Sequence, residues 1–272
     1  MNTELSIPEL QQIARKLRRN IVTMICTAGS GHPGGSLSAV EILTTLYFRV
    51  LQHDPANPNW QDRDRFILSK GHAAPVLYAT LAETGYFPVE ELMTLRKLGS
   101  QLQGHTDRNI PGVEMSAGSL GQGLSFSIGC ALAARLDKKP YRVYALLGDG
   151  ECEEGQVWEA AMAAVHFKLD NLVAIVDRNG LQIDGWTKDI MNLEPFPEKW
   201  RASGWHVIDV DGHDFNQLIE AFEHAKTVKR QPTVIIARTI KGKGVSFMEN
   251  NVDFHGKAPN PAQLEIALKE LA

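Results

Sequence analysis

Two short apolar segments, each followed by an acidic residue, constrain the fold of this chain more than any other feature. Residues 141–147 (Tyr-Arg-Val-Tyr-Ala-Leu-Leu) precede Gly148-Asp149-Gly150, and residues 172–176 (Leu-Val-Ala-Ile-Val) precede Asp177. Such runs of strand-forming residues suit a buried parallel sheet. Residues 153–168 between them carry apolar side chains at helical spacing. The segment therefore predicts a strand, a helix and a second parallel strand.

The carboxyl ends of these two predicted strands indicate a ligand site, because open parallel sheets bind their ligands there. Asp149 offers an anionic oxygen, Asn179 offers a neutral carbonyl oxygen, and the flanking glycines let the backbone approach a phosphate. This set of oxygens suits Mg²⁺ better than zinc. Gly-Asp-Gly alone is most often a turn. Its pairing with Asn179 across one strand-helix-strand unit favours the functional interpretation.

The remaining pattern predicts one α/β domain over residues 1–272, with no internal repeat or low-complexity linker. A chain of 272 residues can form one large domain or two small ones. We expect further helices at 7–28, 36–50, 72–81, 120–136, 215–229 and 261–271, and further strands at 64–68, 206–210 and 233–237. We expect residues 29–35 to connect two helices, and residues 192–197 and 242–256 to form surface or partner-facing loops.

Composition disfavours several functional classes. The formal net charge is −4, from 28 basic and 32 acidic residues mixed along the chain. The sequence therefore shows no concentration of positive charge of the kind that binds nucleic acid or an anionic membrane. Three cysteines without Cys-x-x-Cys spacing argue against a disulfide framework or a zinc site. The first residues lack a signal-like pattern, and no stretch approaches the length of a membrane span. We therefore expect a cytoplasmic protein.

Four histidines stand beside glycine, which distinguishes them from histidines within apolar helical patterns: His32, His72, His105 and His255. By spacing alone, a solvated loop histidine is the simpler interpretation of each. An imidazole held close to a substrate could instead act as an acid or base near neutral pH. Only folding can bring such distant positions together.

Several motifs, taken in order, resemble those of the transketolase family. Gly148-Asp149-Gly150 with Asp177-Arg178-Asn179 resembles the signature of thiamine-diphosphate enzymes in general. The segments that narrow the match are Ser30-Gly31-His32-Pro33-Gly34, Ser69-Lys70-Gly71-His72, Gly104-His105, Gly118-Ser119-Leu120-Gly121-Gln122-Gly123 and Asp253-Phe254-His255-Gly256. They follow the family's order over nearly the whole chain. The resemblance implies a three-layer thiamine-diphosphate-binding fold, with a mostly parallel central sheet flanked by helices.

The resemblance also implies roles for individual residues. Mg²⁺, replaceable by Ca²⁺ or Mn²⁺, would be held by the side chains of Asp149 and Asn179 and the backbone carbonyl of Leu181. The positions that match cofactor-binding residues are His72, Gly118, Ser119, Leu120, Asp149, Gly150, Glu154, Asn179 and His255. The positions that match catalytic histidines are His32 and His105 in the substrate channel and His72 and His255 beside the cofactor.

Two of these positions either have a simpler interpretation or differ from the family pattern. Glu154 matches an acidic residue that links two active sites, but a first-turn helix glutamate favoured by the helix dipole explains it equally well. Ser119 stands where many family members have proline, which predicts a less rigid loop beside the cofactor.

The length implies a divided enzyme. A complete transketolase is more than twice as long, and all the motifs here belong to its first, diphosphate-binding domain. The resemblance therefore implies the N-terminal subunit of a split transketolase, inactive alone. Its partner would be a C-terminal subunit that carries the pyrimidine-binding domain, in an α2β2 heterotetramer. The implied reaction moves a two-carbon ketol unit from a ketose phosphate to an aldose phosphate, as in the pentose phosphate pathway.

Three alternatives remain at this point. The chain could belong to a split transketolase for a specialised sugar, such as apulose phosphate or a sulfosugar. It could be a related thiamine-dependent synthase, which would use pyruvate. It could also be a cofactor-binding regulatory protein without catalysis, which predicts no activity with any partner subunit.

Overall fold

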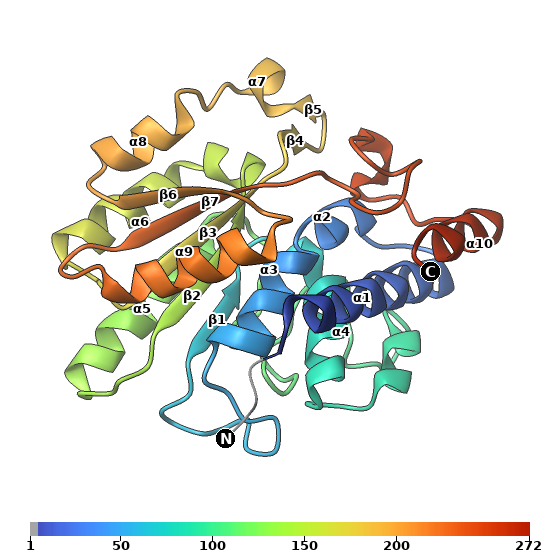
Figure 1. Cartoon of the computed structure of the whole chain (residues 1–272), viewed down its shortest axis with the longest axis horizontal. Helices are drawn as coiled ribbons and strands as arrows, with labels where there is room; N and C mark the ends of the chain where they lie inside the picture. The colour runs from blue at the N-terminus through green and yellow to red at the C-terminus, as the bar shows by residue number, and fades with distance from the viewer. Residues whose placement is uncertain (1–4) are drawn as a thin grey trace.

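A five-stranded parallel sheet forms the centre of the protein in the computed structural model, which describes residues 5–272 (Figure 1). The strands lie in the order β1 (Arg65–Leu68), β2 (Val143–Gly148), β3 (Leu172–Arg178), β7 (Thr233–Arg238) and β6 (His206–Asp211). Each neighbouring pair in this order is parallel. The predicted buried parallel sheet is confirmed, and the strand-helix-strand unit of residues 143–178 supplies its two neighbouring strands β2 and β3.

Helices cover both faces of the sheet, which confirms the three-layer α/β architecture. Successive strand residues point to opposite faces. Tyr144 and Leu146 of β2 therefore belong to one core, while Val143, Ala145 and Leu147 belong to the other. The first core is shared with α1 (Ile7–Ala28), α2 (Pro33–Ser38), α3 (Val40–Thr45), α4 (Ala74–Thr84), α9 (Phe215–Thr227) and α10 (Pro261–Glu270). The second core is shared with α5 (Gln122–Leu136), α6 (Gly155–His166) and α8 (Phe196–Ala202).

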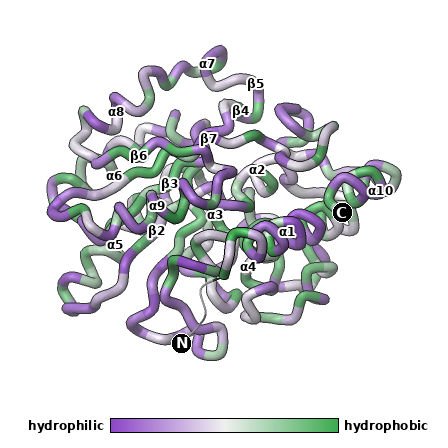
Figure 2. Tube along the Cα trace, viewed as in Figure 1, coloured by the Kyte–Doolittle hydropathy of each residue, from purple (hydrophilic) through white to green (hydrophobic). Residues whose placement is uncertain are grey.

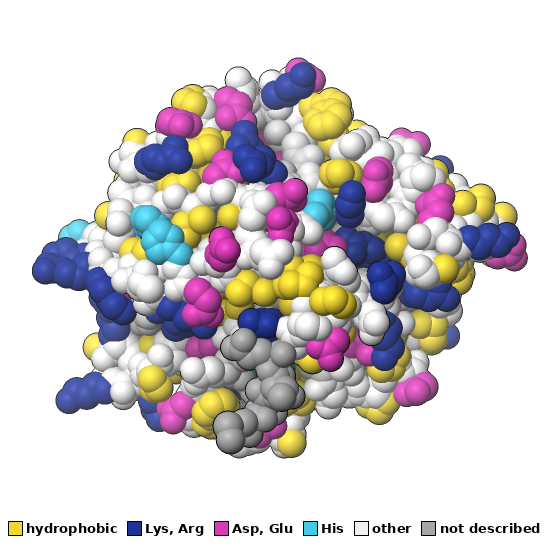
Figure 3. All heavy atoms as spheres, viewed as in Figure 1, with side chains coloured by type: hydrophobic (Ala, Val, Ile, Leu, Met, Phe, Trp, Pro, Cys, Tyr) yellow, Lys and Arg dark blue, Asp and Glu magenta, His cyan; other side chains and the backbone are white. Residues whose placement is uncertain are grey.

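Hydropathy follows this layering, with apolar strands inside and polar segments outside (Figure 2). The sequence sets the ends of the long first helix directly. Ser6 and Glu9 form a capping box at its start, and Gly29 ends it in a left-handed conformation with φ 66°. Basic and acidic side chains are interspersed over the face shown in Figure 3. Among residues 5–272, none of the helices is both long and apolar enough to cross a membrane.

Several predicted helices are interrupted where the backbone changes conformation. The predicted helix 36–50 begins earlier, at Pro33, and consists of α2, α3 and the π-helical segment η1 (Leu46–Val50). Proline is favoured at a first helical position, since it lacks the N–H that would be unpaired there. The predicted helix 72–81 begins with a 3₁₀ turn, η2 (Gly71–Ala73). The predicted helix 153–168 begins later, at Gly155, and the 3₁₀ turn η4 (Gly150–Glu153) precedes it across the extended residue Glu154. Helix α5 begins at Gln122 rather than at 120, because Gly121 has φ 82°.

Two segments predicted as surface or partner-facing loops are partly buried. Phe196 is only 1% exposed and begins α8, and Leu193 is also buried. Within 242–256, Met248 and Phe254 pack into the core, and a 3₁₀ helix η5 (Val252–His255) forms. The prediction that these segments lie at the surface is therefore wrong for these apolar side chains, because their burial stabilises the folded state. Besides α8 and η5, four elements within residues 5–272 were not predicted: η3 (Val89–Thr94), β4 (Leu181–Gln182), β5 (Gly185–Trp186) and α7 (Thr187–Ile190).

Candidate functional site

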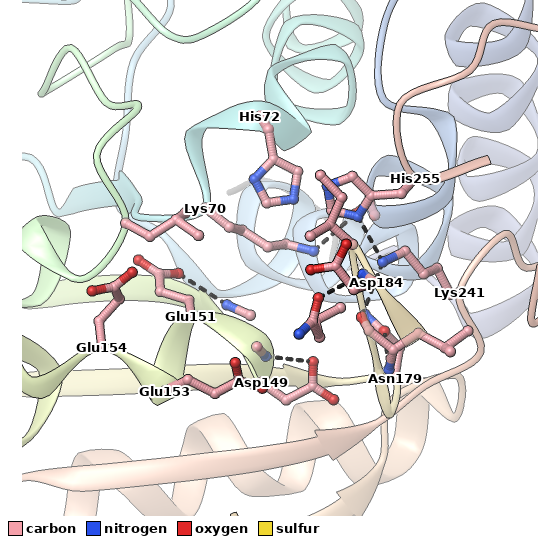
Figure 4. Close-up of a pocket in the computed structure, with 17 residues that line it drawn as sticks. Lys70, His72, Asp149, Glu151, Glu153, Glu154, Asn179, Asp184, Lys241 and His255 are labelled. Carbon is pink, nitrogen blue, oxygen red and sulfur yellow. Dashed lines mark hydrogen bonds between the residues drawn. The ribbon is translucent and has the colours of Figure 1, made fainter. Parts of the chain in front are cut away.

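A cavity of about 280 Å³ opens at the carboxyl ends of β2 and β3 (Figure 4). Gly148, the last residue of β2, pairs with Asp177 of β3, so the residues that follow these strands meet at one edge of the sheet. The cavity is lined by Gly35, Lys70, His72, Leu120, Gly148, Asp149, Gly150, Glu151, Glu153, Glu154, Asn179, Leu181, Gln182, Ile183, Asp184, Lys241 and His255. It therefore collects side chains from segments spread over more than two hundred residues of sequence.

Asp149 is a buried carboxylate without a cationic partner. Its side chain is held by two backbone donors: Gly150 N–H donates to Oδ1 at 2.9 Å and Gly180 N–H donates to Oδ2 at 2.5 Å. Within residues 5–272, no Lys, Arg or His nitrogen lies within 4.0 Å of either oxygen. Burial, followed by the charge of Asp177, raises the pKa of Asp149 to about 6. A positive charge placed here would lower that pKa again.

Two further oxygens that could face a cation come from the turn after β3. The Asn179 side chain is 8% exposed, and its Oδ1 accepts a hydrogen bond from Leu181 N–H at 3.1 Å. Gly180 lies between them with φ 76°, which glycine adopts without strain. The Leu181 carbonyl accepts a hydrogen bond from Lys241 Nζ at 3.0 Å. The turn thus presents an amide oxygen and a backbone carbonyl near the Asp149 carboxylate.

These three residues fit a hard divalent cation. One carboxylate and two neutral oxygens are the ligands that Mg²⁺ and Ca²⁺ prefer, and within residues 5–272 no basic side chain lies close enough to Asp149 to form an ion pair with it. Groups of three or more His, Cys, Asp or Glu residues that could hold a metal do not occur in the described part of the chain. The donor chemistry therefore fits Mg²⁺ and not zinc.

A buried ion pair fixes the loops behind the cavity. Lys70 Nζ donates to Asp177 Oδ2 and, at 2.8 Å, to the Gly35 carbonyl. Ser38 and Thr239 donate further hydrogen bonds to the same carboxylate. Burial alone would raise the pKa of Asp177, but the Lys70 ammonium and these donors bring it below its ordinary value. The sequence marks Asp177 as a strand end and as the first residue of the Asp177-Arg178-Asn179 motif, and the structure shows in addition that it connects four segments.

Glu151 is a second buried carboxylate that fixes loops around the cavity. Its carboxylate accepts hydrogen bonds from Ser69 Oγ, from Gly121 N–H at 2.9 Å and from Gly148 N–H at 3.0 Å. It is 2% exposed, and burial raises its pKa. One side chain thus holds together three of the glycine-rich segments around the cavity. Sequence reasoning missed Glu151, because nothing in its spacing distinguishes it from the neighbouring surface glutamates.

The four glycine-flanked histidines gather into one cluster. The His32 ring lies 5.3 Å from His72, 5.5 Å from His255 and 6.0 Å from His105, measured between centroids. His72 and His255 are stacked at 5.1 Å, and both line the cavity. In Figure 4 they lie on the side of the cavity opposite Asp149. The structure therefore brings together all four histidines that the sequence singled out.

Burial keeps these imidazoles neutral. It is the main cause that lowers the pKa of His32 to about 4 and of His255 to about 3, with neighbouring cations adding to the effect. The pKa of His72 is lowered well below its ordinary range by burial and then by Lys70. The pKa of His105 is lowered by burial and then by Arg96. At neutral pH each ring can both donate and accept a hydrogen bond.

Lys241 is a cation that sequence reasoning missed. It follows β7, is 2% exposed, and its Nζ lies 2.9 Å from His255 Nδ1. Burial lowers the pKa of Lys241 to about 8, against the opposing effect of Asp149. With Lys70 it places two positively charged groups in the cavity wall, where a diphosphate could be bound.

Most of the predicted cofactor residues line the cavity, but two do not. Gly118 and Ser119 are exposed and lie outside the lining, although Gly118 lies beside the His105 ring. Glu154 lines the cavity and is the N-cap of α6 rather than a residue of its first turn, and its side chain makes no capping hydrogen bond. The cofactor-binding roles of these residues stay predictions.

Comparison with known proteins shows which family the chain resembles. Residues 10–271 match the family described as transketolase, thiamine diphosphate binding domain. The chain is 47% identical over 264 residues to the 6-deoxy-6-sulfo-D-fructose transketolase subunit SqwG of a Clostridium species, covering 97% of this chain and 96% of that protein. It is 42% identical over 268 residues to one subunit of the apulose-4-phosphate transketolase of Phocaeicola vulgatus, covering 98% of this chain and 95% of that subunit.

A solved structure gives the same relationship in three dimensions. The transketolase of Campylobacter jejuni matches with a TM-score of 0.93 and 34% sequence identity, covering 98% of this chain. This chain spans only 43% of that longer protein.

Proposed function

This chain belongs to the transketolase family, as a thiamine diphosphate binding domain, and we propose that it is the N-terminal subunit of a two-chain transketolase. In this proposal residues 1–272 form a single domain that binds the diphosphate end of the cofactor through Mg²⁺. The observation that carries the proposal is the convergence of Asp149, Asn179, His72 and His255 on one cavity at the carboxyl ends of β2 and β3.

Each part of the cavity has a separate task. Asp149, Asn179 and the Leu181 carbonyl hold Mg²⁺, whose charge compensates the buried carboxylate. Lys241 and His72 bind anionic phosphate oxygens. Lys70 keeps its ion pair with Asp177 and so fixes the position of the Asn179 turn. Thiamine diphosphate, when bound, supplies the nucleophilic carbon that carries the two-carbon unit between sugars.

His32 and His105 act on the sugar substrate rather than on the phosphates or the metal. Because their pKa values are lowered, His32 and His105 are neutral at physiological pH. A neutral imidazole can accept a proton from a substrate hydroxyl and return it, or can donate a hydrogen bond to a carbonyl oxygen. His32 Nδ1 is buried without a hydrogen-bond partner within residues 5–272, which leaves it available for such a contact.

We infer that the donor is a modified sugar rather than a common pentose phosphate. The two relatives described above are named for 6-deoxy-6-sulfo-D-fructose and apulose 4-phosphate, and both match this chain over nearly its whole length. Both are also named as subunits, which supports a requirement for a C-terminal partner and is compatible with an α2β2 heterotetramer in the cytoplasm. Transfer between common sugar phosphates is the second candidate, since the longer transketolase of C. jejuni has the same fold over this chain.

Complementation tests the proposal directly. The chain is co-expressed with a candidate C-terminal subunit, and the pair is assayed with thiamine diphosphate, Mg²⁺ and ribose 5-phosphate as acceptor. The donors are 6-deoxy-6-sulfofructose, apulose 4-phosphate and xylulose 5-phosphate. We expect two-carbon transfer only when both chains are present, and fastest with a modified donor. Transfer by this chain alone would refute the divided enzyme, and turnover that depends on pyruvate would indicate a different thiamine-dependent synthase.

A further inference from the structure

Glu41 is a buried carboxylate outside the cavity, and it joins two basic side chains from distant segments. It lies in α3, is 7% exposed and is not among the described residues that line the cavity. Arg18 of α1 donates to both of its oxygens, at 2.6 Å and 2.8 Å. His213, in the loop after β6, contacts Glu41 Oε2 through Nδ1 at 2.9 Å. Burial alone would raise the pKa of Glu41, but Arg18 and then His213 lower it to about 2, so the carboxylate is ionised at neutral pH.

The two basic side chains also hold one short stretch of backbone, the turn of residues 240–243. His213 Nε2 accepts a hydrogen bond from Ile240 N–H at 2.9 Å. Because Nε2 is the acceptor there, Nδ1 carries the hydrogen that the carboxylate accepts. Arg18 Nε donates to the Lys243 carbonyl at 3.0 Å. The first and the last residue of the turn are therefore connected, each through one side chain, to the same buried carboxylate.

Lys241 is the residue of this turn that reaches the cavity. Its Nζ donates to the Leu181 carbonyl at 3.0 Å and lies 2.9 Å from His255 Nδ1, so that Figure 4 shows it between His255 and Asn179. Its stem lies against Gly34, where an added Cβ would come within 3.1 Å of Lys241 Cγ. A shift of about 1 Å along either Nζ contact would lengthen that contact beyond the range of a hydrogen bond. The position of the turn therefore decides where this positive charge lies.

Stability alone accounts poorly for this network. A buried ion pair loses the hydration of both charges, and replacing it with well-packed apolar residues is often neutral or stabilising. Within residues 5–272, the remaining side-chain hydrogen bonds of Arg18 and His213 both go to the 240–243 turn. Three buried polar side chains thus act on one turn of four residues. This arrangement favours a role in placing what the turn carries.

We infer that Glu41, acting through Arg18 and His213, positions Lys241 to bind the diphosphate of the cofactor. This role rests on the proposed function, because that function assigns anionic phosphate oxygens to Lys241. Glu41, Arg18 and His213 do not line the cavity, so they are positioning residues and not binding residues. His213 makes the connection testable, because its two ring nitrogens hold different partners.

Two substitutions at His213 separate these two contacts. His213→Asn keeps a donor near the position of Nδ1 and removes the acceptor for Ile240 N–H, whereas His213→Gln places an acceptor near the position of Nε2. In both variants the turn keeps its backbone hydrogen bonds to neighbouring segments, so we expect both to fold. His224→Asn makes the same change at an exposed histidine of α9 and is the matched control.

The first measurement is the Kd of thiamine diphosphate with Mg²⁺ for the two-chain complex, by calorimetric titration. We expect His213→Asn to raise this Kd about tenfold, the size of one charge-assisted hydrogen bond that Lys241 no longer makes well. His213→Gln should recover part of the loss, and His224→Asn should stay within about twofold of wild type. An unchanged Kd for His213→Asn, or His213→Gln that binds no better than His213→Asn, would overturn the proposal.

A double-mutant cycle with Lys241→Met asks whether the effect passes through Lys241. Methionine has a side chain of similar length but no ammonium group that a shifted turn could misplace. In the Lys241→Met background, His213→Asn should therefore change the Kd by less than about twofold. A full tenfold loss in that background would show that His213 supports the fold in general, and it would overturn the proposal.

Hydrogen exchange keeps this test separate from that of the proposed function. If the wild-type complex binds no thiamine diphosphate, the proposed function fails, and the cofactor role of Lys241 fails with it. Exchange of the cofactor-free chain still decides whether the network holds the turn. His213→Asn should speed exchange in peptides that cover residues 239–244 by about tenfold, and peptides from β2 should keep the wild-type rate. Equal acceleration in both regions, or none in the turn, would reject the connection between His213 and the turn.

Discussion

Replacing Asp149 with asparagine removes one buried charge and changes the shape of the side chain very little. In the folded chain the pKa of Asp149 is raised from its ordinary value of 3.8 to about 6, mainly by burial and then by Asp177. The folded state therefore binds this proton more tightly than the unfolded state does. The stabilisation that this bound proton gives the folded state is complete below pH 4 and is lost as the pH rises through 6. At pH 7.5 the ionised Asp149 therefore lowers the free energy of unfolding of the cofactor-free protein by about 3 kcal/mol.

The substitution also has an opposing effect. Gly180 N–H donates to Asp149 Oδ2, and the amide nitrogen of an asparagine placed there cannot accept that hydrogen bond. Leaving a buried N–H unpaired costs about 1 to 3 kcal/mol. The two effects nearly cancel, so we expect the free energy of unfolding of Asp149→Asn to stay within about 2 kcal/mol of wild type without cofactor.

With cofactor the two proteins should differ. Thiamine diphosphate and Mg²⁺ should raise the urea midpoint of the wild-type chain, since a ligand that binds only the folded state stabilises it. Asp149→Asn should show little or no such rise, because it lacks the one anionic metal ligand. Asp184→Asn is the matched control, since Asp184 lines the same cavity but is exposed. It should respond to the cofactor as the wild type does.

The assay is urea unfolding of each variant at pH 7.5, followed by circular dichroism. Each variant is measured without ligand and at cofactor and Mg²⁺ concentrations that span a 1,000-fold range about the wild-type Kd. A full, Mg²⁺-dependent stabilisation of Asp149→Asn would refute the assignment of the metal site. A loss of more than about 4 kcal/mol without cofactor would refute the pKa argument, because the buried charge would then be stabilising the fold.

Three other predictions follow from contacts around the cavity. Asp177→Ala should lower the free energy of unfolding by about 3 to 5 kcal/mol, because the Lys70 ammonium stays buried without its partner. Glu223→Ala, which breaks the exposed pair with Lys226, should lower it by less than about 1 kcal/mol, and chemical denaturation of both variants checks the difference. Gly71→Ala should lower the free energy of unfolding by about 1 to 3 kcal/mol, because the added Cβ would come within 2.8 Å of the Ala117 backbone. An added Cβ at Gly155 meets open space, so Gly155→Ala should leave the stability unchanged or raise it, and thermal unfolding of both variants measures the difference. Mg²⁺-dependent cofactor affinity should be highest between about pH 7 and 8, fall about tenfold per pH unit below the Asp149 pKa of about 6 and fall again above the Lys241 pKa of about 8, measured by calorimetry; an affinity that rose on acidification from pH 7 would contradict the assignment.

The placement of Asp149 and Asn179 could be predicted because it follows from local pattern. Short apolar runs form parallel strands, the helix between them returns the chain, and the residues after each strand must meet at one edge. The register of Gly148 with Asp177 bears this out. The partly buried stretch 242–256 could not be predicted in this way. Its apolar residues have no period, and only their packing into the core that they share with α1, α2 and α10 takes Val245, Met248 and Phe254 out of water.

The polar groups that complete the cavity depend on contacts between distant segments. Lys70 meets Asp177 across 107 residues, and Lys241 meets the Leu181 carbonyl across 60. No spacing rule connects such positions, since the chain between them can take many paths of similar local energy. Glu151 is similar: its neighbours Glu153 and Glu154 have the same chemistry, but Glu151 alone of the three is fully buried among backbone donors.

The sequence by itself determined the layered α/β fold, the edge of the sheet where the cavity lies and, through its motifs, the family. These properties depend on the alternation of apolar residues and on glycines at turns, which act over a few residues. Tertiary structure alone decided which charges are paired, which are left free and which histidines are neutral. Those properties depend on burial and on distances between residues far apart in the chain, and burial exists only after the sheet and its helices have packed.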